Sequence, residues 1–96
     1  MKNLITLRQK IDTIDEQIIS LFNERMKTIK EVSFYKLINN LPINDLTREN
    51  ELIEKNKHLV ANDLSNYYQQ LYKEILKISK DYQIKLIEER KTDDIK

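Results

Sequence analysis

Residues 3–40, NLITLRQKIDTIDEQIISLFNERMKTIKEVSFYKLINN, decide the fold. This stretch contains no Gly and no Pro, the two residues that most often interrupt a helix. Its apolar residues recur three and four positions apart, at Leu4, Leu7, Ile11, Ile14, Ile18, Leu21, Phe22, Ile29 and Val32. That spacing places them on one face of a helix. The stretch therefore predicts a single long amphipathic helix.

Two cations lie on the apolar face of this helix. At about 100° per residue the apolar stripe covers roughly 300° to 40° of the helical wheel, and Arg25 and Lys36 fall near 340° and 0°. A charge on a face meant for burial is costly unless it is paired. The pattern therefore predicts that Arg25 and Lys36 bind an anion.

Two further helices follow. Asn39, Asn40 and Pro42 mark a loop, because Asn favours turns and the residue before Pro is driven out of helical geometry. Asp45 or Asn44 is expected to cap a short helix from about Leu46 to His58 or Val60. After a second break at 61–63, with Asp63 or Ser65 as the cap, a helix of medium length is expected from Leu64 to Glu88. Residues 1–90 then form one all-α domain, and residues 91–96 a frayed tail.

The long helix is too long to be covered by its own chain. At 1.5 Å per residue about 37 residues span roughly 55 Å, whereas a compact domain of this size has a radius of gyration of about 13 Å. The apolar stripe is therefore expected to continue against a second copy in an intertwined helical-bundle homodimer. A simple two-stranded coiled coil is the alternative, but the break at Pro42 and the two further helices favour a bundle.

Composition argues against several classes of function. The net charge is +1 with acids and bases interspersed, which gives no basic face for nucleic acid. There is no Cys, and the only His, His58, has polar neighbours and is expected to be exposed, so neither a thiolate metal site nor serine–histidine catalysis is supported. No stretch approaches the roughly 20 apolar residues of a membrane span, and the N-terminus has no signal core. A cytoplasmic location without metal is the expectation.

Polar residues recur on the apolar faces of the other two helices. Glu49 lies near the middle of one face, and Ser79 and Gln83 lie four apart toward the edge of the other. Each has a structural explanation, since Glu49 can pair with Arg25 or Lys36 and Ser79 can bond back to its own helix. Together with the two cations they predict a polar pocket inside a helical bundle.

These residues, in this order, resemble the all-helical (AroQ-type) class of chorismate mutase, over nearly the whole chain. Residues 7–15 match the opening pattern L-R-x-x-I-D-x-I-D. The resemblance continues through Glu24-Arg25, Val32, Tyr35-Lys36, Pro42 to Glu49, Ser79 and Gln83, with a shortened loop between the second and third helices.

The resemblance implies a three-helix protomer in an intertwined dimer that rearranges chorismate to prephenate, on the route to phenylalanine and tyrosine. It implies that Arg25, with Arg8 from the other subunit, binds the substrate carboxylates, and that Lys36 and Gln83 donate hydrogen bonds to the ether oxygen. It implies that Glu49, with the backbone near Asp45 and Arg48, holds the ring hydroxyl, and that Ser79 seats a carboxylate. The catalytic set is thus Lys36, Gln83 and Arg25, and the walls are Val32, Leu52 and Leu76.

The implied reaction is unimolecular and pericyclic, and it uses no cofactor, metal or nucleophile. Gln83, where a Glu would have to be protonated to donate, favours activity that does not require acidic pH. Lys80, Asp81 and Tyr82 depart from expectation, because they are more polar than the surroundings of a buried pocket.

Two other functions remain open. The first is isochorismate-pyruvate lyase, because the same fold and the same set of cations also resemble that enzyme. The pair Arg48-Glu49 nevertheless favours the mutase. A non-catalytic helical dimer with a regulatory or docking role is the second, although the inward polar residues speak against it. The chain is expected to be freestanding and to associate, in some settings, with another enzyme of the pathway.

Overall fold

The computed structural model describes residues 3–95, with side chains through Lys91, and this part of the chain is helical with no strand. Three α-helices follow one another, α1 (Leu4–Ile38), α2 (Leu46–Asn56) and α3 (Ser65–Ile95). Two 3₁₀ turns, η1 (Lys57–Leu59) and η2 (Asn62–Leu64), lie between α2 and α3. The prediction of an all-α chain with three helices, the second of them short, is confirmed, whereas α3, with 31 residues against 35 in α1, is longer than the medium helix predicted.

Helix α1 begins and ends at asparagines. The side chain of Asn3 accepts a hydrogen bond from the backbone N–H of Thr6 at 2.9 Å, which satisfies one free donor of the first turn. At the other end Asn40 takes a left-handed conformation with φ 54°. The N–H of Leu41 then bonds to the carbonyl of Lys36 at 2.8 Å, and that of Asn40 to Leu37 at 3.4 Å. This pattern is a Schellman motif, which turns the chain back toward the helix it has just left.

Helix α2 begins where the sequence predicts. The carboxylate of Asp45 accepts a hydrogen bond from the N–H of Arg48 at 3.0 Å, as an N-cap does. The regular helix ends at Asn56, and the turn η1 extends it to Leu59, within the predicted range.

The third helix begins within one residue of its predicted start, but its predicted cap and its predicted end need correction. Ser65 is the first residue of α3, and the turn η2, which has no side-chain cap at Ala61, leads into it, so neither Asp63 nor Ser65 acts as the predicted cap. The helix continues past Glu88 to Ile95. Residues 89–95 contain neither Gly nor Pro, and nothing in their backbone chemistry ends a helix. Fraying of residues 91–95 in solution stays a prediction, and Lys96 lies outside the described residues.

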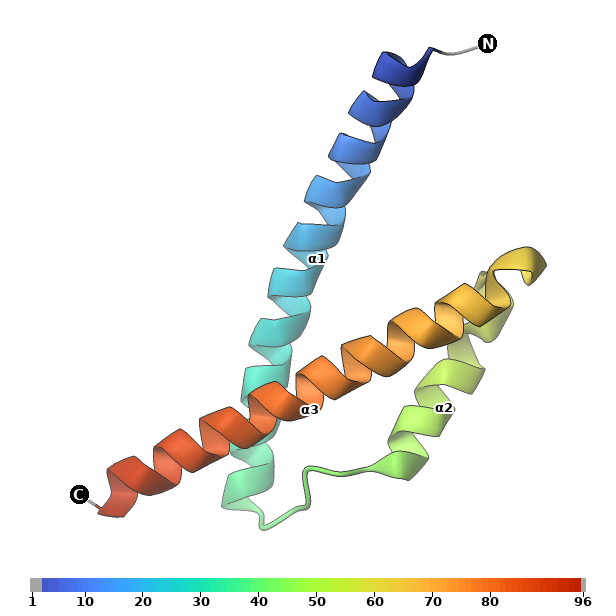
Figure 1. Ribbon diagram of the computed structural model, residues 1–96. Helices are drawn as coiled ribbons and strands as arrows, with labels where there is room; N and C mark the ends of the chain where they lie inside the picture. Colours follow the sequence, from blue (N-terminus) through green and yellow to red (C-terminus); the bar gives the residue numbers. More distant parts are fainter. Residues whose placement is uncertain (1–2, 96) are drawn as a thin grey trace.

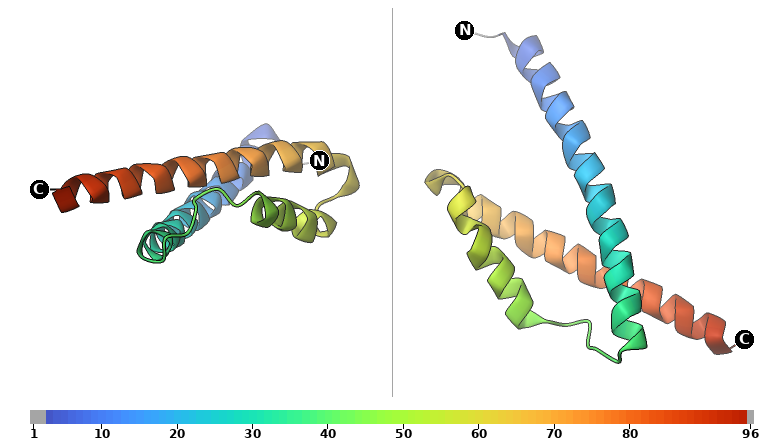
Figure 2. Two further views of the ribbon diagram at one scale, coloured as in Figure 1. Left: turned by 90° about the horizontal axis from the view of Figure 1, so that it is seen from below. Right: turned by 180° about the vertical axis from the view of Figure 1, so that it is seen from behind.

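The C-terminal half of α1 crosses α3, while α2 runs back beside α3 after the loop (Figures 1 and 2). At the α1–α3 crossing the guanidinium of Arg90 lies 5.0 Å from the ring centre of Phe34. Ser33, in the same half of α1, is fully buried, and its hydroxyl donates to the carbonyl of Lys30 at 2.7 Å. Helix α2 is joined to α3 by the hydroxyl of Tyr68, which donates to the carbonyl of Ile53 at 2.8 Å.

The chain buries little of its apolar surface. Among the described residues only Tyr68 and Ile87 are buried apolar side chains. The N-terminal half of α1 extends away from the other helices (Figure 1), and its stripe from Leu4 to Phe22 is exposed. The molecule measures 62 × 28 × 15 Å, with a radius of gyration of 17.5 Å instead of the roughly 13 Å of a compact domain. No helix within the described residues has the length and apolar character to cross a membrane.

Candidate active site

A cavity of about 290 Å³ lies between the three helices. Helix α1 contributes its C-terminal half, the loop before α2 contributes Ile43 and Asp45, α2 its first two turns and α3 its middle. Seven of the eight predicted site residues line this cavity: Arg25, Lys36, Asp45, Arg48, Glu49, Ser79 and Gln83. The predicted wall residues Val32, Leu52 and Leu76 line it as well. The structure therefore brings together residues that are up to 58 positions apart in sequence.

Arg25 reaches across the cavity to α3. Its guanidinium donates a hydrogen bond to the hydroxyl of Ser79, and that hydroxyl donates to the carbonyl of Ile75 at 2.8 Å. The bond back to Ile75 is the structural explanation anticipated for Ser79, and Ser79 also accepts from Arg25. No ion pair joins Arg25 to a carboxylate within residues 3–91. Burial lowers the pKa of Arg25, since removal from water disfavours its charged form. Among the described residues, the hydrogen-bond partner of the Arg25 cation is thus a neutral group.

Lys36 stands in the last turn of α1 and faces the loop that follows. Its ammonium group donates to the carbonyl of Ile43 at 3.1 Å. An ammonium group has three donors, so further donors remain for a ligand. The left-handed turn at Asn40 makes this contact possible, because it folds the loop back over the end of α1.

Glu49 pairs with a residue that periodicity did not select. Its Oε1 lies 3.2 Å from Nζ of Lys80. Pairing with Arg25 or Lys36, the structural explanation considered for Glu49, is therefore wrong within the described residues. Glu49 therefore does not neutralise Arg25 or Lys36, and the charges of these two side chains remain available to a ligand.

Gln83 is the most deeply placed amide of the site. It is 6% exposed, and its Nε2 donates to the carbonyl of Ser79 at 3.3 Å. Its Oε1 is buried without a hydrogen-bond partner within the described residues. An unpaired buried acceptor costs about 1–3 kcal/mol, and such groups concentrate at functional sites. Gln83 thus holds one spare amide hydrogen and one spare oxygen inside the cavity wall.

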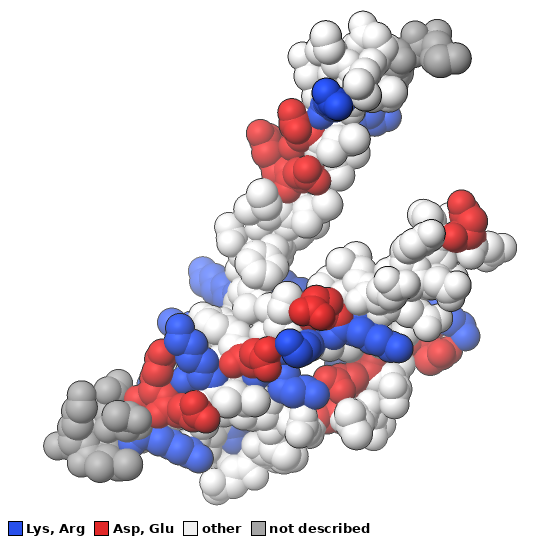
Figure 3. Space-filling model, viewed as in Figure 1, with Lys and Arg blue, Asp and Glu red and all other residues white. Residues whose placement is uncertain are grey.

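The charges around the cavity favour a dianion. Four cations line it, Arg25, Lys36, Arg48 and Lys80, together with two carboxylates, Asp45 and Glu49, so its formal charge is +2. On the face shown in Figure 3, by contrast, Lys and Arg lie beside Asp and Glu along α3. The whole chain carries a net charge of +1, so the excess of positive charge lies in the residues that line the cavity.

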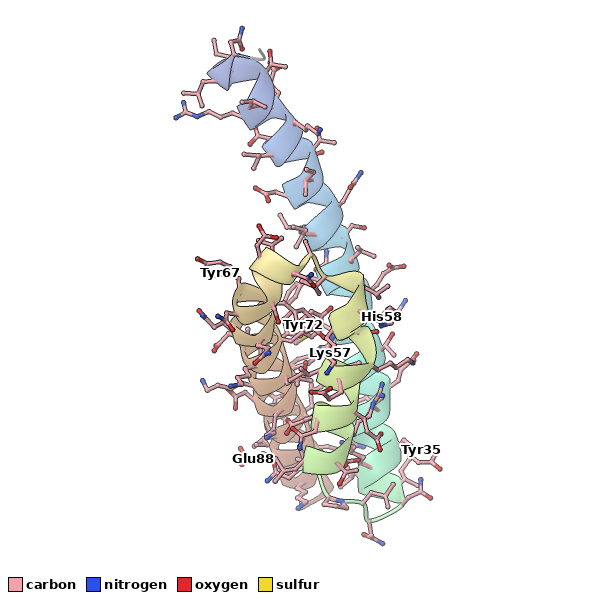
Figure 4. The ribbon with its side chains drawn as sticks, turned by 90° about the vertical axis from the view of Figure 1, so that its right-hand side faces the viewer. Tyr35, Lys57, His58, Tyr67, Tyr72 and Glu88 are labelled. Atoms are coloured by element: carbon pink, nitrogen blue, oxygen red, sulfur yellow. The ribbon has the colours of Figure 1, made fainter. Side chains whose placement is uncertain are left out.

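Arg8 is the one predicted site residue that the structure does not bring to the cavity. It is exposed, near the start of α1. It lies 17 residues before Arg25, or roughly 25 Å along the helix axis. Figure 4 shows the side chains of this half of α1 projecting without neighbours from α2 or α3. Arg8 therefore does not reach the cavity of its own chain.

His58 and the tyrosines lie outside the cavity. His58 is exposed in η1, as predicted, and points away from the helices in Figure 4. Tyr68 and Tyr72 pack together with ring centres 5.0 Å apart. Within the described residues no cluster of His, Asp and Glu side chains has an arrangement that holds a metal ion.

Sequence reasoning missed Lys80 as a site residue. The signal was present, because Lys80 follows Leu76 by four residues and so extends the same edge of α3. Thr28, Ile29 and Ile43 also line the cavity without having been singled out. Ile43 contributes through its backbone carbonyl, which side-chain patterning does not reveal.

The model of one protein family, chorismate mutase type II, matches residues 7–84. This range begins at the residue before Arg8 and ends at the residue after Gln83, so it contains every predicted site residue.

Curated relatives match as well. The chain is 47% identical over 55 residues to a bifunctional chorismate mutase/prephenate dehydratase of Aquifex aeolicus, covering 57% of this chain and 15% of that protein. It is 35% identical over 72 residues to the protein of the same description from Escherichia coli K12, covering 69% and 19%. With that of Buchnera aphidicola from Schizaphis graminum it shares 36% over 87 residues, covering 88% and 23%. The chain thus spans about a fifth of the length of these relatives, and no solved structure matches it.

Replacing Arg25 by Met should stabilise the unliganded protein by about 1 kcal/mol while weakening dianion binding, because a desolvated cation with no carboxylate partner is exchanged for an apolar chain of similar length. Urea denaturation at one fixed protein concentration measures the change. Lys27→Met, at an exposed position two residues away, is the control and should change stability by less than about 0.5 kcal/mol. A clear loss of stability in Arg25→Met would show that Arg25 serves the fold.

Proposed function

The chain belongs to the chorismate mutase type II family, and on that premise we propose that it rearranges chorismate to prephenate as an intertwined homodimer. The observation that carries the proposal is the convergence of Arg25, Lys36, Glu49, Ser79 and Gln83 on one cavity of formal charge +2. Chorismate is a dicarboxylate, and the charge of the cavity is complementary to it. The activity is that of an isomerase in aromatic amino acid biosynthesis.

Exposed area supports the homodimer. The chain exposes 8247 Å², whereas a compact monomer of its mass exposes about 5,800 Å². The excess of about 2,400 Å² is of the size that obligate dimers bury. The apolar stripe of α1 from Leu4 to Phe22 is exposed, and it suits a second copy of the same helices.

The dimer also gives Arg8 a role. On the wheel Arg8 lies about 100° from Arg25, and it is too distant to reach the cavity of its own chain. In an intertwined arrangement the N-terminal half of α1 lies over the partner, and Arg8 completes the partner's cavity. Each site then has Arg25 from one chain and Arg8 from the other for the two carboxylates, and Ser79 helps to seat one of them.

The reaction needs positioning and charge stabilisation. The enolpyruvyl arm must be held over the ring, which the two arginines and the apolar walls of Val32, Leu52 and Leu76 accomplish. Negative charge grows on the ether oxygen as its bond to the ring breaks. Lys36 and the free amide hydrogen of Gln83 donate to that oxygen, and one such preorganised donor is worth about 3–4 kcal/mol.

Helix α2 holds the ring. Glu49 accepts a hydrogen bond from the ring hydroxyl, and the backbone near Asp45 and Arg48 supports it. The N-cap hydrogen bond, which the backbone N–H of Arg48 donates to the carboxylate of Asp45, fixes this first turn of α2. The chemistry proceeds by rearrangement of bonds within the substrate, so no residue is required as a nucleophile or proton carrier.

We further infer a cytoplasmic location and association with another enzyme of the pathway. The relatives from Aquifex aeolicus and Escherichia coli are described as bifunctional chorismate mutase/prephenate dehydratases. Because those relatives combine the two activities in one protein, we expect this chain to associate with a prephenate dehydratase, which would take up its product.

The test is the loss of chorismate absorbance at neutral pH without added metal, with the product identified and isochorismate assayed in parallel. Prephenate from chorismate supports the mutase. Pyruvate and salicylate from isochorismate alone would assign the lyase instead. A folded dimer that turns over neither compound would leave the non-catalytic role.

Lys36→Ala should lower kcat for chorismate by about 100- to 1,000-fold, since it removes the charged donor aimed at the ether oxygen. The variant should remain helical and dimeric by circular dichroism and sedimentation. Lys30→Ala, an exposed lysine of the same helix, is the control and should keep wild-type turnover. Near-normal turnover of Lys36→Ala would refute the assignment of Lys36.

A mixture of Arg8→Ala and Arg25→Ala chains, each inactive alone, should recover activity. A hybrid dimer has one site with both arginines, so random exchange restores about a quarter of wild-type sites. The control is a mixture of Arg25→Ala and Lys36→Ala chains, which should recover nothing, because both residues come from the same α1. Verified hybrids that stay inactive in the first mixture would show that the sites are not shared.

A further inference from the structure

The ion pair between Glu49 and Lys80 differs from the other ion pairs of the described residues. It joins two helices, α2 and α3, whereas the other three join residues three or four apart on one helix. The Glu49 and Lys80 side chains are 21% and 28% exposed, and the side chains of the others are at least 58% exposed. An enclosed pair that bridges two elements constrains both of them more than an exposed pair does.

Helix α2 depends on such links for its position. None of its residues is buried. Two polar contacts fix it to α3, the hydrogen bond from Tyr68 to the carbonyl of Ile53 and the ion pair from Lys80 to Glu49. Because Glu49 lies in the first turn of α2, Lys80 fixes the end of this helix that faces the cavity.

Lys80 also changes the charge that a ligand meets. Without it the residues lining the cavity sum to +1, and with it they sum to +2. Glu49 would otherwise present an unpaired carboxylate to an entering dicarboxylate, and like charges repel. The second carboxylate of the lining, that of Asp45, is engaged as the N-cap of α2.

We propose that Lys80 is a positioning residue for substrate binding, which holds Glu49 through Oε1 so that its other oxygen accepts the ring hydroxyl of the substrate. This proposal rests on the proposed function. Lys80 acts through Glu49 on binding and is distinct from Lys36 and Gln83, which act on the breaking bond. Replacing Lys80 should therefore raise KM, whereas replacing Lys36 or Gln83 should lower kcat.

The test is a cycle of Lys80→Met, Glu49→Gln and the double variant, with kcat and KM measured for chorismate. Loss of a charge-assisted contact changes affinity by about ten- to a hundredfold. Lys80→Met should therefore lower kcat/KM by that factor, mostly through KM, and Lys80→Arg should restore most of it. In the Glu49→Gln background Lys80→Met should cost less than about threefold, because residues that act as a unit are non-additive.

Lys77→Met is the matched control. Lys77 lies three residues earlier on α3, is 68% exposed and pairs with Asp81 on the solvent side. It should leave both kinetic constants unchanged, and the urea midpoint of Lys80→Met should stay near that of Lys77→Met.

Three results would overturn the proposal. These are an unchanged KM in Lys80→Met, additive losses in the double variant, and a kinetic loss that tracks a fallen urea midpoint. Because the wild-type chain is assayed first, failure of the proposed function is seen separately. An inactive wild-type dimer would refute both, whereas an active wild type with an unaffected Lys80→Met would refute only the role of Lys80.

Discussion

Positive charge on the inner face of α1 is the constraint on which the rest of the structure depends. Arg25 and Lys36 lose water when the helices pack, and each receives a neutral partner in exchange, the hydroxyl of Ser79 and the carbonyl of Ile43. Reaching Ile43 requires the chain to fold back after α1, which the left-handed Asn40 permits. The same loop delivers Asp45 to the start of α2 and so places Glu49 at the cavity. One electrostatic requirement thus connects the end of α1, the loop and the first turn of α2.

Neutral hydrogen-bond partners replace the water that Arg25 and Lys36 lose, and they do so without cancelling the positive charge of either side chain. If Arg25 and Lys36 were paired with carboxylates of the chain, the cavity would attract an anion only weakly. Glu49, the carboxylate that the sequence pattern offered as a partner for Arg25 or Lys36, instead pairs with Lys80 of α3. The arrangement reserves the two cations of α1 for a ligand, which is what a site for a dianion needs.

Periodicity predicted the helices and the inward polar residues well, since both follow from 3.6 residues per turn. It identified five residues that the structure gathers from different helices, Arg25, Lys36, Glu49, Ser79 and Gln83, whereas Asp45 and Arg48 were predicted only through the family resemblance. It failed where the outcome depends on a neighbour from another element. The partner of Glu49 and the role of the Ile43 carbonyl are set by tertiary geometry. The third helix extends beyond its predicted end at Glu88, because residues 89–95 contain neither Gly nor Pro and include the good helix formers Glu, Arg and Lys.

The site and the assembly are one physical problem in this chain. Two groups of the cavity cost folding free energy, the desolvated guanidinium of Arg25 and the unpaired side-chain oxygen of Gln83. Within the described residues only two apolar side chains are buried to offset these costs, and the stripe of α1 is exposed. In the proposed dimer the partner covers that stripe and supplies the missing apolar burial. The partner's Arg8 arrives by the same contact, so stability and a complete set of cations depend on a single interface. A single chain would then lack both, which is why association and activity should be lost together when the stripe is disrupted.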